Sequence, residues 1–398
     1  MIDKTTSKDI FIYYLFSFCL GFYIANGTTV LFERVLGFSY SQVFILGAFY
    51  MLMFILFEVP SGAFADLLGR KKTIALGCLL LTLGAITSGL SNNFWQLFLS
   101  FFLWAAGFSC ISGASEALLY DRLKDEEQYA KVLGKSKFYF LGATALAAIV
   151  GPMLFAQDFR YPYLFSAVPF LAAGIAILFF SSEDIKGKFT LREHLNQIKI
   201  GGQFAFKNKF ILWAMGALAL TFAIWYNLSN SFQPFLQDIG FTIKEFSFLL
   251  PAIFLAQAAG GFFAGSLLKA LGETKIFILG ILLFGISVGL AGYLGIKLSL
   301  VFILSYSFLL GILQTVISVY ANRHIESSHR ATVISVQSMA ATVSAALTLF
   351  LFGFLTDKIG LSKLFIILGG LALGVGVLLL IFKPRETSDP PVLDANRL

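Results

Sequence analysis

Charged residues are scarce in this sequence. Only 13% of the 398 residues are charged and 58% are hydrophobic, whereas a soluble domain carries about 25% charged residues. So few charges cannot cover a surface that faces water, and lipid is the simplest alternative surrounding for the apolar residues. The 46 phenylalanines suit both lipid-facing surfaces and an apolar cavity. The composition therefore predicts an integral membrane protein.

Cysteine and histidine are also rare, with three residues of each. An odd number of cysteines, each within an apolar run, argues against a disulfide framework. No two of them have metal-ligand spacing, and the histidines are accompanied by no matching set of acids or cysteines. We therefore predict no metal site. The residues concerned are Cys19, Cys78, Cys110, His194, His324 and His329.

Motifs of catalysis and of nucleotide binding are missing. The sequence has no zinc motif, no glycine-rich phosphate loop with Lys-Ser or Lys-Thr, and no serine elbow. We predict that the protein is not an enzyme, has no cofactor and is not driven directly by ATP. The net charge of +7 comes mostly from short loops between apolar runs, which indicates membrane topology rather than nucleic-acid binding.

Twelve apolar runs are long enough to span a bilayer, which takes about 20 residues in a helix. They lie near 10–32, 42–65, 73–91, 94–120, 138–156, 162–180, 210–234, 246–268, 275–294, 298–321, 331–355 and 362–382. These runs are far longer than the roughly ten alternating residues of a barrel strand. The first is also too long for the apolar core of a signal peptide. The predicted fold class is an all-α membrane protein with twelve transmembrane helices.

The segment from Ser181 to Lys209 divides the runs into two sets of six. It is the longest hydrophilic connection, and its basic residues are Lys186, Lys188, Arg192, Lys199, Lys207 and Lys209. We predict a bundle over residues 1–180, a cytoplasmic linker over 181–209, a second bundle over 210–382 and a cytoplasmic tail over 383–398.

Basic residues fix the predicted orientation, because they concentrate in cytoplasmic loops. With the N-terminus inside, 23 of the 29 Lys and Arg residues fall in inner segments and six in outer ones. The six outer residues are Arg34, Arg160, Lys244, Lys297, Lys358 and Lys363. We therefore expect a multi-pass protein of the cell membrane with both termini in the cytoplasm.

The two sets of six echo each other weakly. Tyr120-Asp121-Arg122 ends the fourth run, and Tyr320-Ala321-Asn322-Arg323 ends the tenth. Such similarity at corresponding positions is typical of an internal duplication. Transporters are often built from repeats, with the substrate site near the bilayer midplane between them.

The loop after the second run carries the most specific motif. It reads Gly62-Ala-Phe-Ala-Asp66-Leu-Leu-Gly69-Arg70-Lys71-Lys72, which resembles the signature loop of the major facilitator superfamily, in which Gly-x-x-x-Asp precedes Gly-Arg and another basic residue. The sequence departs at Leu67, where a basic residue is common. The six-plus-six layout and the central linker extend the resemblance to the whole chain.

The resemblance implies two pseudo-symmetric six-helix bundles that rock about a central cavity. It also implies a charge network that latches the bundles together on the inner side and stabilises the outward-open state, with Asp121 as the partner of Arg70. The physical interpretation of the loop agrees, because Asp66 at a helix end can pair with Arg70 or accept from the N-terminus of a neighbouring helix. The network comprises Gly62, Asp66, Gly69, Arg70, Lys71 and Asp121.

Two signatures of drug antiporters are weak in this chain. No arginine occurs between Phe94 and Tyr120, within the fourth run. Gly151-Pro152 in the fifth run lacks the glycine pair that follows in those antiporters. Both departures weigh against a drug-antiport function without excluding it.

Glu58 and Glu116 are the acids inside the predicted spans, and both are candidates for proton coupling, since charges within a membrane are expensive. Both lie within about 12 Å of the inner boundary, because a helix rises about 1.5 Å per residue. Glu58 has an alternative role in structural bonding beside Pro60. Glu116 shares a helix face with Ser109 and Ser112, and apolar neighbours such as Trp104 and Phe108 favour its protonated form. The alternative for that face is close helix packing through the serines.

The resemblance implies that the first, fourth, seventh and tenth helices line the cavity. Polar and aromatic residues on them bind either solute or neighbouring helices. They are Tyr13, Ser17, Asn26, Ser109, Ser112, Trp225, Asn227, Asn230, Ser307, Gln314 and Ser318. No basic residue lies deep in these runs, so a neutral or cationic amphipathic solute fits better than an anion.

The leading functional hypothesis is proton-coupled efflux of a small apolar or amphipathic organic compound by alternating access, by a monomer in the lipid bilayer. The runner-up is a uniporter or importer of a small neutral solute. A lipid scramblase or a solute sensor on a transporter scaffold is the alternative of another class, and the sensor is disfavoured because no large soluble domain is present.

Overall fold

The computed structural model describes residues 4–123, 125–181, 202–203, 205–323, 325 and 330–384. Over these residues the chain forms helices and no strand, and twelve helices are long and apolar enough to cross a membrane. The predicted all-α fold with twelve spans is therefore confirmed. Most of the linker and nearly all of the tail lie outside the described residues.

Within each half the helices follow one another closely in sequence. In chain order they are α1 (Lys4–Gly21), η1 (Ile24–Gly27), α2 (Thr29–Val35), α3 (Tyr40–Leu68), α4 (Arg70–Leu90), α5 (Phe94–Leu123), α6 (Glu126–Phe155), α7 (Tyr161–Leu178), α9 (Lys209–Asp238), η2 (Ile243–Glu245), α10 (Phe246–Leu271), α11 (Glu273–Leu294), α12 (Ser299–Arg323), α13 (Arg330–Ile359) and α14 (Leu361–Ile381).

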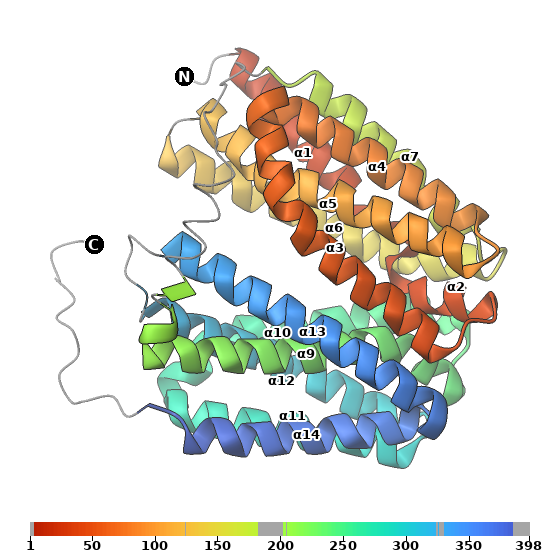
Figure 1. Cartoon of the computed structure of the whole chain (residues 1–398), viewed down its shortest axis with the longest axis vertical. Coiled ribbons are helices and arrows are strands. Elements are labelled where there is room, and N and C mark those ends of the chain that lie inside the picture. The colour runs from red at the N-terminus through yellow and green to blue at the C-terminus, as the bar shows by residue number, and fades with distance from the viewer. Residues whose placement is uncertain are drawn as a thin grey trace, which may run out of the picture.

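Figure 1 shows the helices in two groups, α1 to α7 above and α9 to α14 below. In the first half α4 packs against α5 and α7, and in the second half α11 packs against α14 and α12. The halves meet mainly where α3 packs on α13 and α6 on α10. We call the end of the bundles that carries Arg70, Asp121 and Lys209 the linker face, and the opposite end, with Gly37 and Gly295, the far face.

Two boundaries differ from those predicted. The first span is broken, because α1 ends at Gly21 and the chain resumes as η1 and α2, whereas the sequence indicated one helix over 10–32. The fifth span begins twelve residues earlier than predicted, at Glu126. Asp125 caps that helix by accepting from the Gln128 amide at 2.7 Å, and Glu127 and Lys131 pair one turn apart. A polar stretch thus continues the helix beyond its apolar run.

Glycine allows several helix pairs to approach closely. Gly77 of α4 and Gly107 of α5 face each other, and a Cβ atom on either would lie within 3 Å of the other's carbonyl oxygen. In the second half a Cβ atom on Gly260 of α10 would overlap the Phe308 carbonyl of α12. Helices in a membrane associate through such small-residue contacts, since lipid offers no hydrophobic drive between them.

We predict that Gly260→Ala destabilises the protein, because α10 and α12 must separate to admit the methyl group. Overpacking of this kind costs about 1–3 kcal/mol. Gly265→Ala is the matched control on the same helix, since nothing lies within 4 Å of its added Cβ. Thermal unfolding in detergent measures both variants. Equal melting temperatures for the two would show that the α10–α12 contact is not tight.

Candidate functional site

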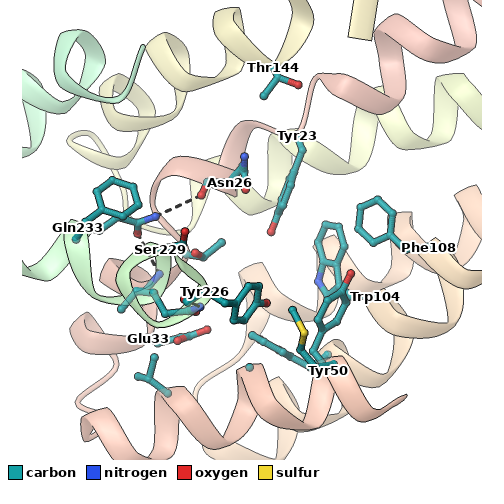
Figure 2. Close-up of a pocket in the computed structure, with 18 of the residues that line it drawn as sticks. Tyr23, Asn26, Glu33, Tyr50, Trp104, Phe108, Thr144, Tyr226, Ser229 and Gln233 are labelled. Atoms are coloured by element: carbon teal, nitrogen blue, oxygen red, sulfur yellow. Dashed lines mark hydrogen bonds between the residues drawn. The ribbon is translucent and has the colours of Figure 1, made fainter. Parts of the chain in front are cut away.

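A pocket of about 610 Å³ lies between the two halves. That volume is typical of small-molecule sites. Its walls come from the end of α1, η1, α2, α3, α5, α6 and α7 of the first half, and from α9 and α10 of the second. Figure 2 shows side chains of both halves around this space.

The lining is mainly aromatic, with a few amides and hydroxyls and one charged side chain, Glu33. The aromatic residues are Tyr23, Tyr50, Phe101, Trp104, Phe108, Phe140, Tyr163, Phe222, Trp225, Tyr226, Phe232 and Phe254. The uncharged polar residues are Asn26, Thr29, Thr144, Ser229, Asn230 and Gln233. Among the described lining residues there is no lysine or arginine, so these residues offer no built-in partner to an anion.

The break in the first span places one wall of this pocket. Asn26-Gly27 lies in it, a dipeptide that favours turns. A broken helix leaves backbone groups without intrahelical partners. Gln233 of α9 takes up two of them: its Oε1 accepts from the Val30 amide at 3.3 Å, and its Nε2 donates to the Asn26 carbonyl at 3.4 Å, the bond drawn dashed in Figure 2.

Two helices of the first half hold the same segment from the other side. The Ser166 hydroxyl of α7 accepts from the Ala25 amide at 3.2 Å. Gly151 of α6 lies so close to η1 that a Cβ atom there would overlap the Ile24 carbonyl. The irregular backbone is therefore enclosed by protein, as it must be at membrane depth.

Glu33 is the charged residue that the sequence analysis missed. It lies on α2 just beyond the predicted first span, and only 2% of its surface is exposed. Within the described part of the chain its carboxyl forms no ion pair or hydrogen bond. The neighbouring Arg34 is engaged elsewhere: its Nη1 donates to the Phe38 carbonyl at 2.5 Å, and its guanidinium lies 4.2 Å from the centre of the Tyr40 ring. One feature of the sequence could have drawn attention to Glu33: it is the first residue after the apolar run over 10–32.

Three of the predicted cavity residues line the pocket: Asn26, Trp225 and Asn230. Others have partners in or between helices. Ser109 donates to the Phe54 carbonyl of α3 at 3.0 Å, and Asn227 donates to Thr348 of α13 at 2.9 Å. The remaining candidates are not among the lining residues; they are Tyr13, Ser17, Ser112, Ser307, Gln314 and Ser318.

Glu116 and Glu58 lie outside the pocket. The Glu116 side chain is 51% exposed, and its Oε1 lies 3.7 Å from the Lys137 Nζ of α6. This setting differs from the expected apolar one, because Trp104 and Phe108 line the pocket two to three turns away along α5. Glu58 is exposed near the linker face. A role in proton coupling stays a prediction for both.

The charge network at the linker face is partly visible. Arg70 pairs with Asp121, its expected partner, and also donates to the Ala117 carbonyl at 2.8 Å. Gly69 turns the chain before Arg70 with a φ of 89°, a conformation natural only to glycine. The side chain of Asp66 is not among those described. The effect of the network on transport stays a prediction, and so does the membership of Gly62 and Lys71 in it.

The second half repeats this ion pair with the charges exchanged. Glu273 begins α11 where Arg70 begins α4, and Arg323 ends α12 where Asp121 approaches the end of α5. Arg323 Nη2 lies 2.6 Å from Glu273 Oε2. The weak sequence echo between the halves therefore corresponds to an equivalent contact in space.

Comparison with known proteins finds one family over the whole chain. A family model described as Major Facilitator Superfamily matches residues 10–241 and 214–397. An uncharacterized MFS-type transporter of Bacillus subtilis (strain 168) is 24% identical over 348 residues, which are 83% of this chain and 84% of that protein. A cis,cis-muconate transport protein of Acinetobacter baylyi is 22% identical over 357 residues, 87% of this chain and 86% of that one.

A solved structure has the same fold. The crystal structure of the nucleoside transporter NupG superposes with a TM-score of 0.81, covers 96% of this chain and 100% of that one, and is 12% identical. At this identity the likeness concerns the fold alone.

We predict that Gln233→Leu destabilises the protein, because it leaves the Val30 amide and the Asn26 carbonyl without their partner from α9. An orphaned buried polar group costs about 1–3 kcal/mol. Gln237→Leu, one turn later on the same helix and exposed, is the control. Thermal unfolding in detergent should show a lower melting temperature for Gln233→Leu only. Equal stability of the two variants would mean that Gln233 does not hold the broken segment.

Proposed function

The chain belongs to the Major Facilitator Superfamily and is a membrane transporter, and from this premise we propose that it exports a small amphipathic organic compound in exchange for protons. The compound binds in the pocket between the halves, and Glu33 carries the exchanged proton. The observation that carries this proposal is that Glu33, nearly fully buried, is the charged residue of the pocket lining.

The lining supports an amphipathic substrate. Aromatic rings offer a large apolar contact area together with polar tips. The amides of Asn26 and Asn230 add hydrogen-bonding groups at fixed positions. A few polar groups in a mostly apolar wall are what orients a small molecule in a binding site.

The environment of Glu33 supports proton exchange. A buried carboxylate without a cation beside it is disfavoured against its neutral form, because desolvation penalises the charge. Glu33 therefore holds a proton readily when the pocket is closed to water. Access of water from one side or the other then decides where that proton is released.

The contacts between the halves support alternating access. The hydrogen bonds of Gln233 to the broken segment and those of Asp357 to the start of α3 join the halves toward the far face. The ion pairs of Asp121 and Glu273 at the linker face each lie within one half. We take the linker face as cytoplasmic from the basic-residue count, so the conformation corresponds to one closed toward the outside.

We predict that Glu33→Gln abolishes proton-driven accumulation while leaving exchange of substrate down its gradient. The change keeps the shape of the side chain and removes its titration. The assay uses everted vesicles with an acidic interior, a panel of neutral and cationic amphipathic dyes, and a fluorescent monitor of internal pH. Substrate addition should release protons in the wild type and not in Glu33→Gln.

Glu116→Gln is the matched control, since its carboxylate is half exposed and paired with Lys137. We expect that variant to keep proton-driven accumulation. The opposite result would reject Glu33: if Glu33→Gln accumulates substrate fully and Glu116→Gln does not, Glu116 is the residue that carries the proton. If neither the variants nor the wild-type protein responds to a pH gradient, proton exchange is rejected.

A further inference from the structure

We infer that the substrate is a monovalent organic cation that replaces the proton on Glu33. The inference rests on the proposed function and names its substrate class. In the described pocket lining the charge of an ionised Glu33 has no basic residue to balance it. A bound cation would supply that balance and form a charge-assisted contact in a dry site, where such contacts are strong.

The aromatic wall suits the same class of molecule. Figure 2 shows Tyr23, Tyr50, Trp104 and Tyr226 around the open centre of the pocket. Tyr23 and Trp104 pack together with ring centroids 4.7 Å apart, and Trp104 Nε1 donates to Ser88 at 3.2 Å, which fixes its ring. Rings of this kind attract organic cations through their faces, by up to about 2 kcal/mol when water is excluded.

The titratable groups on which the charge of Glu33 acts electrostatically come from three parts of the chain. They are Tyr23 before η1, Tyr163 of α7 and Tyr226 of α9. Tyrosines stay neutral near neutral pH, so they do not compete for its proton. Arg34, beside Glu33 on α2, is held by Phe38 and Tyr40, and Asp238 of α9 interacts with Arg34.

Competition for one carboxylate gives a simple exchange. Either a proton or the organic cation neutralises Glu33, and both cannot do so together. One cation leaving and one proton entering transfer equal charge in opposite directions. The cycle is then electroneutral, and it responds to the pH gradient but not to the membrane potential.

The test compares tetraphenylphosphonium, a monocation, with neutral triphenylphosphine oxide. Binding to the purified protein is followed by quenching of tryptophan fluorescence, because Trp104 and Trp225 line the pocket. We expect the apparent Kd of tetraphenylphosphonium to rise about tenfold for each unit of pH below the titration of Glu33. Binding of the neutral compound should be weak and independent of pH.

Glu33→Gln should weaken tetraphenylphosphonium binding by at least about tenfold and remove its pH dependence, whereas Glu116→Gln should leave both unchanged. The wild-type pH series needs no variant, so it holds even if Glu33→Gln folds poorly. Equal, pH-independent binding of both probes would overturn the cation inference. Proton-driven export of the neutral probe that depends on Glu33 would overturn it too, yet leave the proposed function intact.

A second inference comes from the loop between α13 and α14. It reads Gly353-Phe-Leu-Thr-Asp357-Lys-Ile-Gly360, which repeats the Gly-x-x-x-Asp-x-x-Gly spacing of Gly62, Asp66 and Gly69. Gly360 has a φ of 79° and ψ of 167°, close to the 89° and 143° of Gly69. The pattern and the backbone conformation therefore recur on the far face, at the end of a helix that packs on α3.

Asp357 joins the two halves directly. Its Oδ1 accepts from the Tyr40 amide at 2.7 Å, and its Oδ2 accepts from the Ser41 amide at 2.9 Å and the Ser41 hydroxyl at 2.5 Å. These amides begin α3, and a carboxylate is stabilised at a helix N-terminus by free N–H groups and by the helix dipole. Beside it, α13 and α3 pack so closely that a Cβ atom on Gly353 would lie 2.9 Å from the Phe44 Cβ.

The geometry points to Asp357 as a latch that holds the far face closed. Opening that face separates α13 from α3 and strips Asp357 of all three donors. The loop with Asp66 occupies the corresponding place at the linker face. Each copy of the motif thus lies where it can stabilise one of two alternating states.

The latch is tested by spin-label distances in the full-length protein in nanodiscs. One pair of labels, at Asn93 and Ile296, spans the far face, and another, at Lys72 and Lys275, spans the linker face; all four positions are exposed. The native cysteines are buried. Asp357→Ala should shift the ratio of far-face-open to far-face-closed molecules by about tenfold or more, lengthening the first distance and shortening the second.

Glu245→Gln is the control, because Glu245 is a far-face carboxylate whose bonds to Thr242 and Lys297 stay within the second half. It should leave both distances as in the wild type. Asp357→Asn, which keeps an acceptor oxygen, should give a smaller shift than Asp357→Ala. Wild-type distance distributions in Asp357→Ala would overturn the latch.

Discussion

The break in the first spanning helix is the constraint on which the site depends. Backbone groups at membrane depth must find partners within the protein, so the break between Gly21 and Thr29 can exist only where neighbours supply them. Ser166 and Thr144 do so from the first half, by bonding to the Ala25 amide and the Gly21 carbonyl, and Gln233 does so from the second. The same contacts therefore fix the pocket wall and bring the two halves into register.

The architecture could be predicted from the sequence because it depends on run length and charge placement. The twelve runs correspond to the twelve spans of the described chain, although the first span is broken and some ends differ. Glu126 shows why the ends were missed, since a capped, ion-paired helix continues into water without an apolar signal. The pairing of Arg70 with Asp121 was also within reach, because the resemblance of the loop to the family's signature motif implies it and both residues lie at helix ends.

The pocket acid could not be predicted in the same way. The predicted span ended at residue 32, which placed Glu33 in an outer loop beside the flanking charge of Arg34. The break after Gly21 lengthens the first span by residues that do not form a regular helix, and the sequence alone did not reveal it. Burial of Glu33 follows only from the fold of η1 and α2 against the second half. Glu116 was favoured for sharing a face with serines, and that face instead bonds to α3 and to Lys137.

Glu33 and the donors of the proposed latch, Tyr40 and Ser41, lie on one short stretch of chain. Arg34 follows Glu33 directly, donates to Phe38 and stacks on Tyr40, and the Tyr40 amide bonds to Asp357. Each link in this series is a hydrogen bond or a ring contact over a few residues, so we expect α2 and the start of α3 to move together. On the latch proposal, release of Tyr40 by Asp357 would free the segment that carries the pocket carboxyl, and neutralisation of Glu33 would favour the dry, closed arrangement. The two proposals then predict that opening of the far face and loss of the charge partner from Glu33 are coupled through this segment of backbone.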